Sequence, residues 1–258
     1  MIVVAPSDRR FPRHRRHTLA FLHTIRADSP VHLDAEVDLS ALATERAART
    51  DPPSVFVYVL HALGRVLARH PDAAATLTGP AWWPRLVRGS QVDAKVTLDQ
   101  WIDGERVVVS AVVPDIDVAG REFLRARLAR LRDAAPGTLP ETAGAALLAR
   151  LPVPLGRAAL ALAVRGAGRR RRFGSVAVTS LGHRRVQRFF SSGGTAVTIG
   201  LGRVTDRPVA RDGRVTIVPV LPLSLTFDHR VLDGAAAADV LDDLVSTLEA
   251  PPVPEPGP

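Results

Sequence analysis

The feature that most constrains this chain is residues 214–241, RVTIVPVLPLSLTFDHRVLDGAAAADVL, in which an apolar run leads directly into an alanine-rich segment. The apolar, β-branched residues of the run predict a largely buried strand. Asp233 occupies the N-cap position of a helix that begins at Gly234. We therefore expect His229 to emerge at the edge of a core, where strand and helix meet.

The rest of the chain mixes helices with hairpins. Alternating apolar and polar residues predict a half-buried strand at 31–39, and the stretch 94–113 is typical of a hairpin around Asp103-Gly104. A polar turn at Asp212-Gly213 is expected to join strands at 195–202 and 213–227. Helical spacing of apolar residues occurs at 17–25, 55–69 and 119–133. Without βαβ alternation or internal repeats, the prediction is an α+β fold with a mixed, mostly antiparallel sheet flanked by helices.

Composition limits the classes of protein to consider. The chain has 258 residues, of which 46% are apolar, enough for one large domain with its own core. Arginines interrupt every apolar run before it reaches the ~20 residues of a membrane span, and the N-terminus is no secretory signal. The absence of cysteine excludes disulfides, thiolate-metal sites and a cysteine nucleophile, and fits a cytoplasmic protein.

The formal charge of +8 is carried almost entirely by arginine, because Lys95 is the only lysine. This charge fits a polyanionic partner such as nucleic acid, an anionic membrane or coenzyme A. It equally fits the alanine- and arginine-rich composition of a GC-rich genome. Aromatic residues make up only 5% and are not interleaved with the arginines, which argues against binding of single strands by stacking. We therefore expect neither a nucleic-acid nor a membrane partner.

His229 and Asp233 are the candidate catalytic pair. A neutral histidine with a pKa near the working pH is the usual general base of an enzyme. Asp228 and Arg230 flank this histidine, and Gly234 lacks a Cβ where a ligand has to approach the backbone. A simpler interpretation stays open, in which Asp233 only caps the helix and His229 is an ordinary surface residue.

Residues 224–241, SLTFDHRVLDGAAAADVL, closely resemble the DHRxxDG signature of dihydrolipoamide acyltransferases, the acyl-transferring components of 2-oxoacid dehydrogenase complexes. VAVTSLG at 176–182 is similar to the strand-turn segment of that family, commonly FTISNLG. Further similar segments bring the coverage to about 11–135 and 173–250. The resemblance implies a chloramphenicol acetyltransferase-like fold and a homotrimer whose active site lies at the subunit boundary.

The resemblance also implies roles for individual residues. Acyl transfer between thiols needs a base that forms the thiolate and a donor that holds the tetrahedral oxyanion. His229 matches the base and Thr179 the donor, although Thr179 taken alone is an ordinary strand residue. Asp233 would orient the site through an arginine near the N-terminus. Arg16 matches the family's position for this arginine, within a register shift of one residue in RHRR. Related chloramphenicol acetyltransferases carry a second histidine where this chain has Asp228, which favours the dihydrolipoamide branch.

The implied substrates are acyl-coenzyme A and a lipoyl thiol, without a metal. Lys95 is predicted to lie at the start of a strand, so the lipoyl group is expected from another chain, or the acceptor is a free thiol. The coenzyme-contacting residues are not identified by the sequence. We expect one catalytic domain at 1–250, a disordered Pro-rich tail at 251–258, and no lipoyl or subunit-binding domain.

Three features depart from the family. Residues 136–172 have no counterpart in it, and they suit a cover over the acyl pocket, a membrane-surface segment, a basic site for coenzyme A phosphates, or simply a packed helical insertion. The family's PPQ segment is replaced by FFSSGGTAV at 189–197, so a different substrate channel is expected. The leucine-rich C-terminal anchor of the family is also missing, which predicts a trimer that assembles no further.

Three functions compete at this point. The first is a coenzyme A-dependent acyltransferase, and the second is a non-catalytic trimeric scaffold related to it. The third is a membrane-surface or nucleic-acid-binding module that uses residues 165–172. Loss of a cavity that accepts a thioester favours the scaffold, whereas His229 within reach of Thr179 across a trimer interface favours the enzyme.

Overall fold

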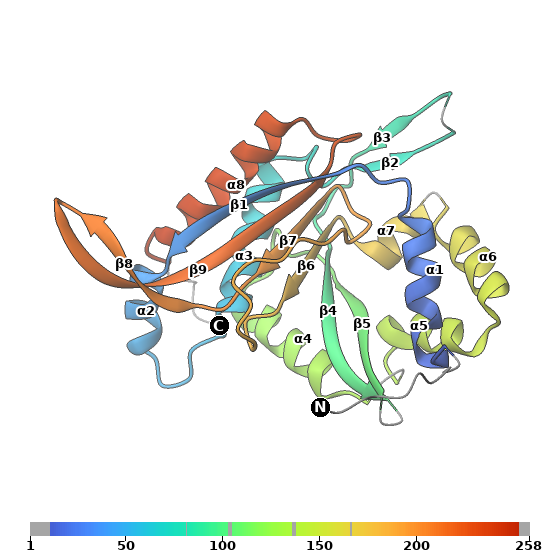
Figure 1. Cartoon of the computed structure of the whole chain (residues 1–258), viewed down its shortest axis with the longest axis horizontal. Helices are drawn as coiled ribbons and strands as arrows, with labels where there is room; N and C mark the ends of the chain where they lie inside the picture. Colours follow the sequence, from blue (N-terminus) through green and yellow to red (C-terminus); the bar gives the residue numbers. More distant parts are fainter. Residues whose placement is uncertain (1–10, 81, 103–104, 136–137, 166, 253–258) are drawn as a thin grey trace, which may run out of the picture.

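A mixed β-sheet forms the centre of the molecule in the computed structural model, which describes residues 11–80, 82–102, 105–135, 138–165 and 167–252. Its strands are β1 (Pro30–Asp38), β4 (Ala94–Ile102), β5 (Glu105–Val113), β6 (Val176–Ser180), β7 (Val197–Leu201), β8 (Thr205–Arg211) and β9 (Arg214–Asp228). The order is β1-β9-β7-β6-β4-β5, with β8 paired to the first half of β9 (Figure 1). Only β4–β6 and β6–β7 are parallel pairs within this sheet. The predicted α+β class and the mostly antiparallel sheet are confirmed.

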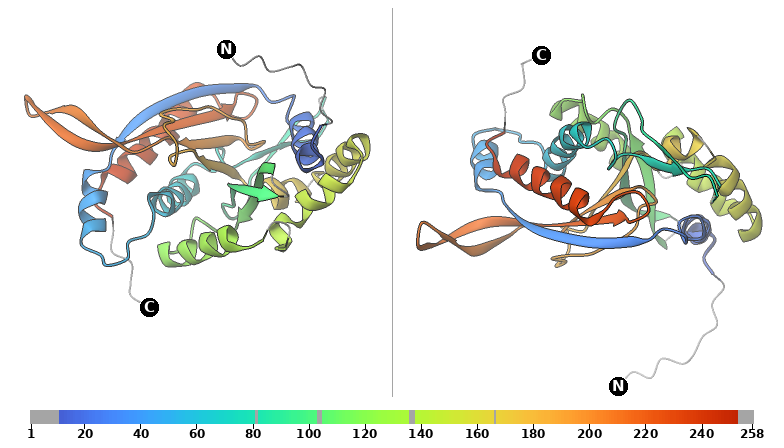
Figure 2. Two further views of the ribbon diagram at one scale, coloured as in Figure 1. Left: turned by 60° about the horizontal axis from the view of Figure 1, so that its bottom comes forward. Right: turned by 90° about the horizontal axis from the view of Figure 1, so that it is seen from above.

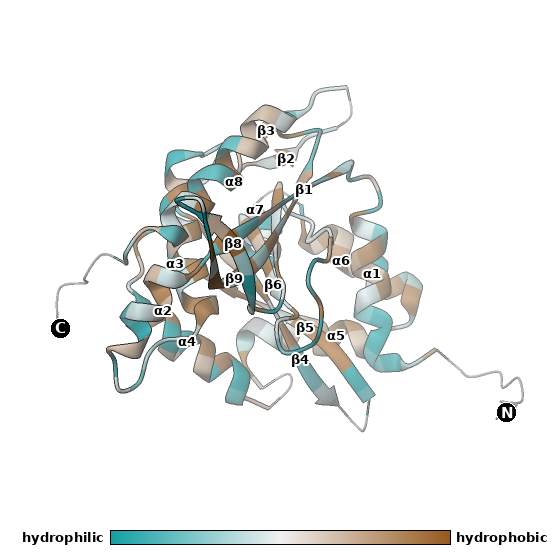
Figure 3. Cartoon of the chain, turned by 60° about the vertical axis from the view of Figure 1, so that its left-hand side comes forward, coloured by the Kyte–Doolittle hydropathy of each residue, from teal (hydrophilic) through white to brown (hydrophobic). Residues whose placement is uncertain are grey.

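One face of the sheet is apolar because alternate residues of a strand point to the same side. A row of fully buried side chains crosses four strands in register: Val96, Val178, Ile199 and Leu225. Helices α3 (Val55–Arg69) and α8 (Gly234–Glu249) pack against each other and cover this face. Each such side chain contributes roughly 1.5–3 kcal/mol by leaving water. Figure 3 shows the hydrophobic colour concentrated on the strands and on the helix faces turned toward them.

The opposite face of the sheet carries polar side chains. Lys95 and Thr97 of β4 alternate with the buried Ala94 and Val96, so their side chains point away from the core. Over this side lie α1 (Arg16–Thr24), α5 (Pro140–Arg150), α6 (Val153–Ala163) and α7 (Ala167–Phe173). Helix α1 packs on α5 and α6, and α7 contacts β4 and β5, as the grouping of these helices at one end of the sheet shows (Figure 2). The segment 136–172 is therefore a helical cover, apart from residues 136–137 and 166, which lie outside the described ranges.

Two local predictions need correction. The turn at Asp212-Gly213 was expected to join the strands at 195–202 and 213–227. It joins β8 to β9 instead, because β8 is an additional strand between β7 and β9. Both turn residues have positive φ, 49° and 74°, as a tight two-residue hairpin turn requires. A small second sheet of β2 (Thr76–Thr78) and β3 (Arg85–Val87) was not predicted.

The remaining elements are η1 (Arg13–Arg15), α2 (Ser40–Ala47) and α4 (Arg121–Asp133). The predicted hairpin 94–113 forms as β4 and β5, and its turn Asp103-Gly104 lies outside the described residues. The same holds for residues 253–258 of the predicted Pro-rich tail and for residues 1–10. Within the described ranges, no helix is both long and apolar enough to cross a bilayer.

Candidate active site

The turn between β9 and α8 holds His229 and Asp233 side by side. The backbone N–H of His229 donates to the carbonyl of Ser29 at 2.9 Å, which anchors the turn to the chain before β1. Asp233 occupies the N-cap position as predicted, but its side chain makes no capping hydrogen bond. Its Oδ1 lies instead 3.7 Å from Nδ1 of His229. The carboxylate thus faces the imidazole and not the helix N–H groups, which removes the main support for a capping role.

This pair is open to the outside of the chain. The side chain of His229 is 50% exposed and that of Asp233 is 90% exposed. A Cβ built on Gly234 would meet no atom of the chain within 4 Å. A substrate or a second subunit can therefore approach the pair without displacing any part of the same chain.

Asp228 supports the turn rather than the open pair. Its carboxylate is buried and accepts hydrogen bonds from the Nε of Arg230 at 2.9 Å and from the backbone N–H of Ser29 at 3.2 Å. Burial alone would raise the pKa of Asp228, but the hydrogen bonds from Arg230 and Ser29 outweigh it and hold the pKa below its ordinary value. Arg230 also reaches Asp28 at 2.8 Å. The charged residues on either side of His229 therefore hold the backbone of the turn, and with it the imidazole, in place.

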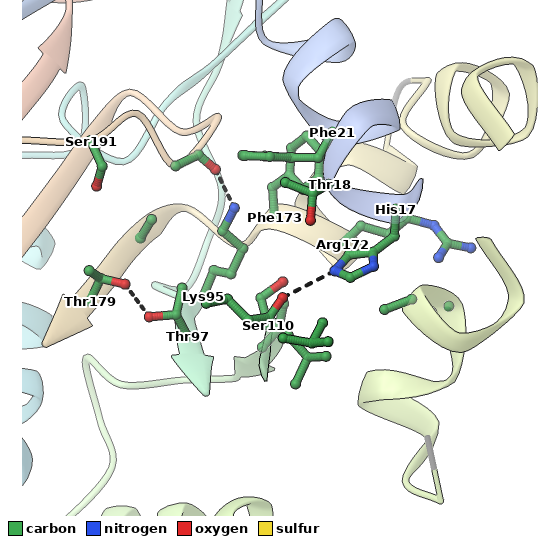
Figure 4. Close-up of a pocket in the computed structure, with 18 of the residues that line it drawn as sticks. His17, Thr18, Phe21, Lys95, Thr97, Ser110, Arg172, Phe173, Thr179 and Ser191 are labelled. Atoms are coloured by element: carbon green, nitrogen blue, oxygen red, sulfur yellow. Dashed lines mark hydrogen bonds between the residues drawn. The ribbon is translucent and has the colours of Figure 1, made fainter. Parts of the chain in front are cut away.

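Thr179 lies in a different place, on the wall of a cavity of about 1130 Å³. Its hydroxyl forms a hydrogen bond with the hydroxyl of Thr97 on the neighbouring strand (Figure 4). The polar face of β4, β5 and β6 makes the floor of the cavity, and α1, α5, α6 and α7 make its walls. The cavity is thus large enough for an extended substrate, and Thr179 presents a hydroxyl group to it.

Thr179 and His229 do not meet within one chain. Thr179 pairs in register with Gly200, and Gly200 pairs with Ser224 of β9. His229 follows Ser224 by five residues, which corresponds to about 16 Å along the strand. Thr179 also lies two strands away, or about 10 Å, in the perpendicular direction. A site that uses both side chains therefore requires two copies of the chain.

The expected link between Arg16 and Asp233 is not made within one chain. Arg16 begins α1, which packs on the helices of the 136–172 segment, and its Nη1 donates to the carbonyl of Leu151 at 3.2 Å. Leu151 is the C-cap residue of α5, where a positive charge is favoured by the helix dipole. The arginine is thus engaged by the helical segment 136–172.

Lys95 is a buried ionisable residue of the cavity that sequence reasoning missed as a site residue. It is 4% exposed, and its Nζ donates a hydrogen bond to the carbonyl of Gly193. The rings of Phe21 and Phe173 flank the ammonium at 4.5 and 4.8 Å. Burial, reinforced by the charge of Arg169 and opposed by that of Asp28, lowers the pKa of Lys95 to about 7. A lone lysine alternating with Ala94 and Val96 was the signal available in the sequence.

Residues 189–193 form part of the cavity wall beside Lys95. Besides the contact with Lys95 at Gly193, Ser192 donates to Asp28 at 3.0 Å and Gly194 accepts from Arg169 at 2.8 Å. The different substrate channel expected at 189–197 stays a prediction. Arg170 of α7 is also used internally, because it binds Asp93 at 3.0 Å.

Comparison with solved structures defines the fold class of this chain. The fold matches that of a chloramphenicol acetyltransferase with a TM-score of 0.52 at 14% identity, over 93% of this chain and 96% of that one. It matches the dihydrolipoamide acetyltransferase of Azotobacter vinelandii better, with a TM-score of 0.71 at 21% identity, over 95% and 92% of the two chains. The chain therefore has the chloramphenicol acetyltransferase-like fold.

The sequence then narrows the relationship. Residues 174–253 match the family model of the 2-oxoacid dehydrogenases acyltransferase catalytic domain. A 53-residue stretch is 43% identical to the dihydrolipoyllysine-residue acetyltransferase component of the pyruvate dehydrogenase complex of Bacillus subtilis (strain 168). That match spans 20% of this chain and 12% of the relative. The resemblance to the catalytic domain of dihydrolipoamide acyltransferases is thus confirmed, by sequence over 174–253 and by fold over nearly the whole chain.

Proposed function

We propose that this chain is an acyltransferase that moves an acyl group between thiols, from acyl-coenzyme A to dihydrolipoamide or a similar acceptor. One observation carries the proposal. The histidine and carboxylate of the family signature face each other at the open end of β9, while a threonine hydroxyl faces a cavity of about 1130 Å³ on the same sheet. These are the base and the oxyanion donor that thioester exchange requires.

In the proposed reaction the Nε2 atom of His229 takes the proton of the acceptor thiol. The thiolate attacks the thioester carbonyl, and the hydroxyl of Thr179 donates a hydrogen bond to the resulting oxyanion. Collapse of this intermediate expels the coenzyme A thiolate, which recovers the proton from the imidazolium. The carboxylate of Asp233, whose Oδ1 lies 3.7 Å from Nδ1, holds the ring in place.

The active unit is proposed to be a homotrimer in which His229 faces Thr179 of the partner subunit. The separation of the two residues within one chain and the open space around Gly234 support this arrangement. The mechanism of the Azotobacter enzyme has been described in terms of a serine, a histidine and an asparagine. Thr179, His229 and Asp233 would supply a hydroxyl, an imidazole and a polar side chain of the same kinds here.

The lipoyl group, where it is the acceptor, is proposed to come from another chain. Lys95 is the only lysine and is 4% exposed beneath α1 and α7, so it cannot carry a swinging lipoyl arm. A free dithiol is the other acceptor that fits. The proposed location is the cytoplasm, where both coenzyme A and reduced thiols are present.

The alternative of a non-catalytic scaffold predicts a closed or filled substrate channel. The cavity beside Thr179 and the intact His229–Asp233 pair count against it. The internal contacts of Arg169 and Arg170 likewise count against a membrane or nucleic-acid module built on 165–172.

The test is acyl transfer from a panel of acyl-coenzyme A donors to free dihydrolipoamide. The reaction is measured as the amount of free coenzyme A that is released. Size-exclusion chromatography with light scattering measures the oligomeric state of the same sample. We expect turnover by a trimer, and the preferred donor defines the acyl class. A well-folded trimer without turnover on any donor would shift the assignment to the scaffold.

A further inference from the structure

We propose that the cavity under α1, α5, α6 and α7 recognises a substrate that carries a carboxylate, with the ammonium group of Lys95 as its counter-ion. The inference deepens the proposed acyltransferase function and rests on it for the identity of the substrate. The carboxylate site itself is argued from the cavity alone.

Lys95 has hydrogen-bonding capacity that the chain leaves unused. An ammonium group has three donors, and the structure assigns one of them to the carbonyl of Gly193. Among the described residues, no carboxylate lies within 4.0 Å of its Nζ, although burying a charge without a partner is costly. The rings of Phe21 and Phe173 hold the side chain in position but supply no negative charge. An anion is the missing partner.

The charges around Lys95 leave the cavity positive. The charge of Arg169 in α7 lowers the pKa of Lys95, and that of Asp28, which follows α1, raises it. Asp28 is already engaged by Arg230 and Ser192. Asp99, on the same strand as Lys95, is held by Arg106. The other charged or titratable residues that line the cavity are Arg15, His17, Arg171, Arg172 and His183.

The surroundings suit a carboxylate on a hydrocarbon chain better than a phosphate. The ammonium lies between two phenyl rings, and apolar surface makes up most of the cavity wall. Lys95 and Thr97 are two residues apart on β4, about 6.6 Å along the strand, and Thr97 contacts Thr179. The carboxylate at Lys95 and the reacting carbonyl beside Thr179 would thus lie in the same cavity.

Two sources of this carboxylate are possible, namely the acyl group and the acceptor thiol, and two matched pairs of substrates separate them. Glutaryl-coenzyme A is compared with valeryl-coenzyme A, using dihydrolipoamide as acceptor. Dihydrolipoate is compared with dihydrolipoamide, using acetyl-coenzyme A as donor. In one of the two pairs, we expect the substrate that bears a carboxylate to have a kcat/KM at least about 10-fold higher than that of its neutral counterpart.

Lys95→Met should abolish this preference, because it removes the charge that pairs with the carboxylate. Lys95→Gln, which keeps a donor for Gly193, separates loss of charge from loss of that contact. Arg171→Met is the matched control at the cavity wall and should retain the preference, because it removes a charge that is not buried beside Thr97.

A binding measurement gives a result that does not depend on turnover. Calorimetry with glutarate at about pH 8, in buffers of different ionisation enthalpy, counts the protons taken up. Because Lys95 with a pKa of about 7 is mostly neutral at that pH, an anion that restores its charge should draw up nearly one proton. The uptake should vanish in Lys95→Met.

The outcomes distinguish the two proposals. Normal turnover of neutral substrates, with no carboxylate preference and no Lys95-dependent uptake, would overturn the carboxylate site and leave the acyltransferase intact. Uptake that depends on Lys95, without turnover of any substrate, would support the carboxylate site and overturn the proposed function.

Discussion

Thr179 and His229 are displaced by about 16 Å along the strands and by two strand positions across the sheet of a single chain. Both side chains are nevertheless placed for chemistry, Thr179 beside a cavity and His229 beside Asp233 at an open turn. This separation is the reason for proposing that the active site lies at a subunit interface.

Mixed trimers test the interface directly. His229→Ala and Thr179→Val chains are each expected to be inactive alone. When they are unfolded, mixed in equal amounts and refolded together, each interface has a one-in-four chance of combining an intact histidine with an intact threonine, so about a quarter of wild-type activity should return. Each variant refolded alone is the control. No recovery from well-formed mixed trimers would contradict an active site shared between two subunits.

His229→Ala should lower kcat/KM for acyl transfer by at least about 100-fold, because loss of a general base costs that much or more. The melting temperature should change little, since the imidazole is half exposed and contacts mainly Asp233 and Phe227. His70→Ala is the matched control, because His70 pairs with Asp243 away from the turn. Equal losses in the two variants would argue against a catalytic His229.

Thr179→Val should reduce kcat by about 100-fold through loss of the oxyanion donor, at nearly constant side-chain volume. Thr179→Ser keeps the hydroxyl and should recover most of the rate. Thr97→Val removes the hydroxyl that contacts Thr179 and should cost less than about 10-fold, because the donor itself remains. If Thr97→Val proves as damaging as Thr179→Val, the assignment of the donor has to be reversed or shared.

Lys95 should make stability depend on pH in a defined direction. Its pKa is about 7 in the folded chain and 10.5 in its ordinary state, so between these values the unfolded chain binds the extra proton. The free energy of unfolding should therefore rise with pH in this window, by an amount on the order of 3 kcal/mol between about pH 7 and pH 9.5. Urea unfolding of wild type and Lys95→Met at both pH values isolates this difference, which should be absent from the variant.

Much of the local structure was predictable from the sequence. The alternation at 31–39 and 94–113 became β1 and the β4–β5 hairpin, and the apolar spacing at 55–69 became α3. The signature around His229 also predicted the turn from β9 into α8. These predictions succeeded because periodicity and turn residues act over short stretches of chain.

Other features depend on which segments pack together. β8 was missed because apolar and polar residues show little alternation in TDRPVAR at 205–211. These residues form a strand only by pairing with β9. The contact of Arg16 with Leu151 joins segments 135 residues apart and needs the helical cover to exist first. No spacing rule in the sequence describes such contacts.

The sequence by itself determined the α+β class, the family resemblance, and the identity of the histidine and carboxylate at the end of β9. Tertiary structure alone decided that Lys95 is buried beside a cavity, that the 140–173 helices cover the polar face of the sheet, and that Thr179 lies far from His229 within one chain. The physical reason is that hydrophobic periodicity is encoded between near neighbours, whereas burial of a charge and the distance between two sites are set by the packing of elements distant in sequence.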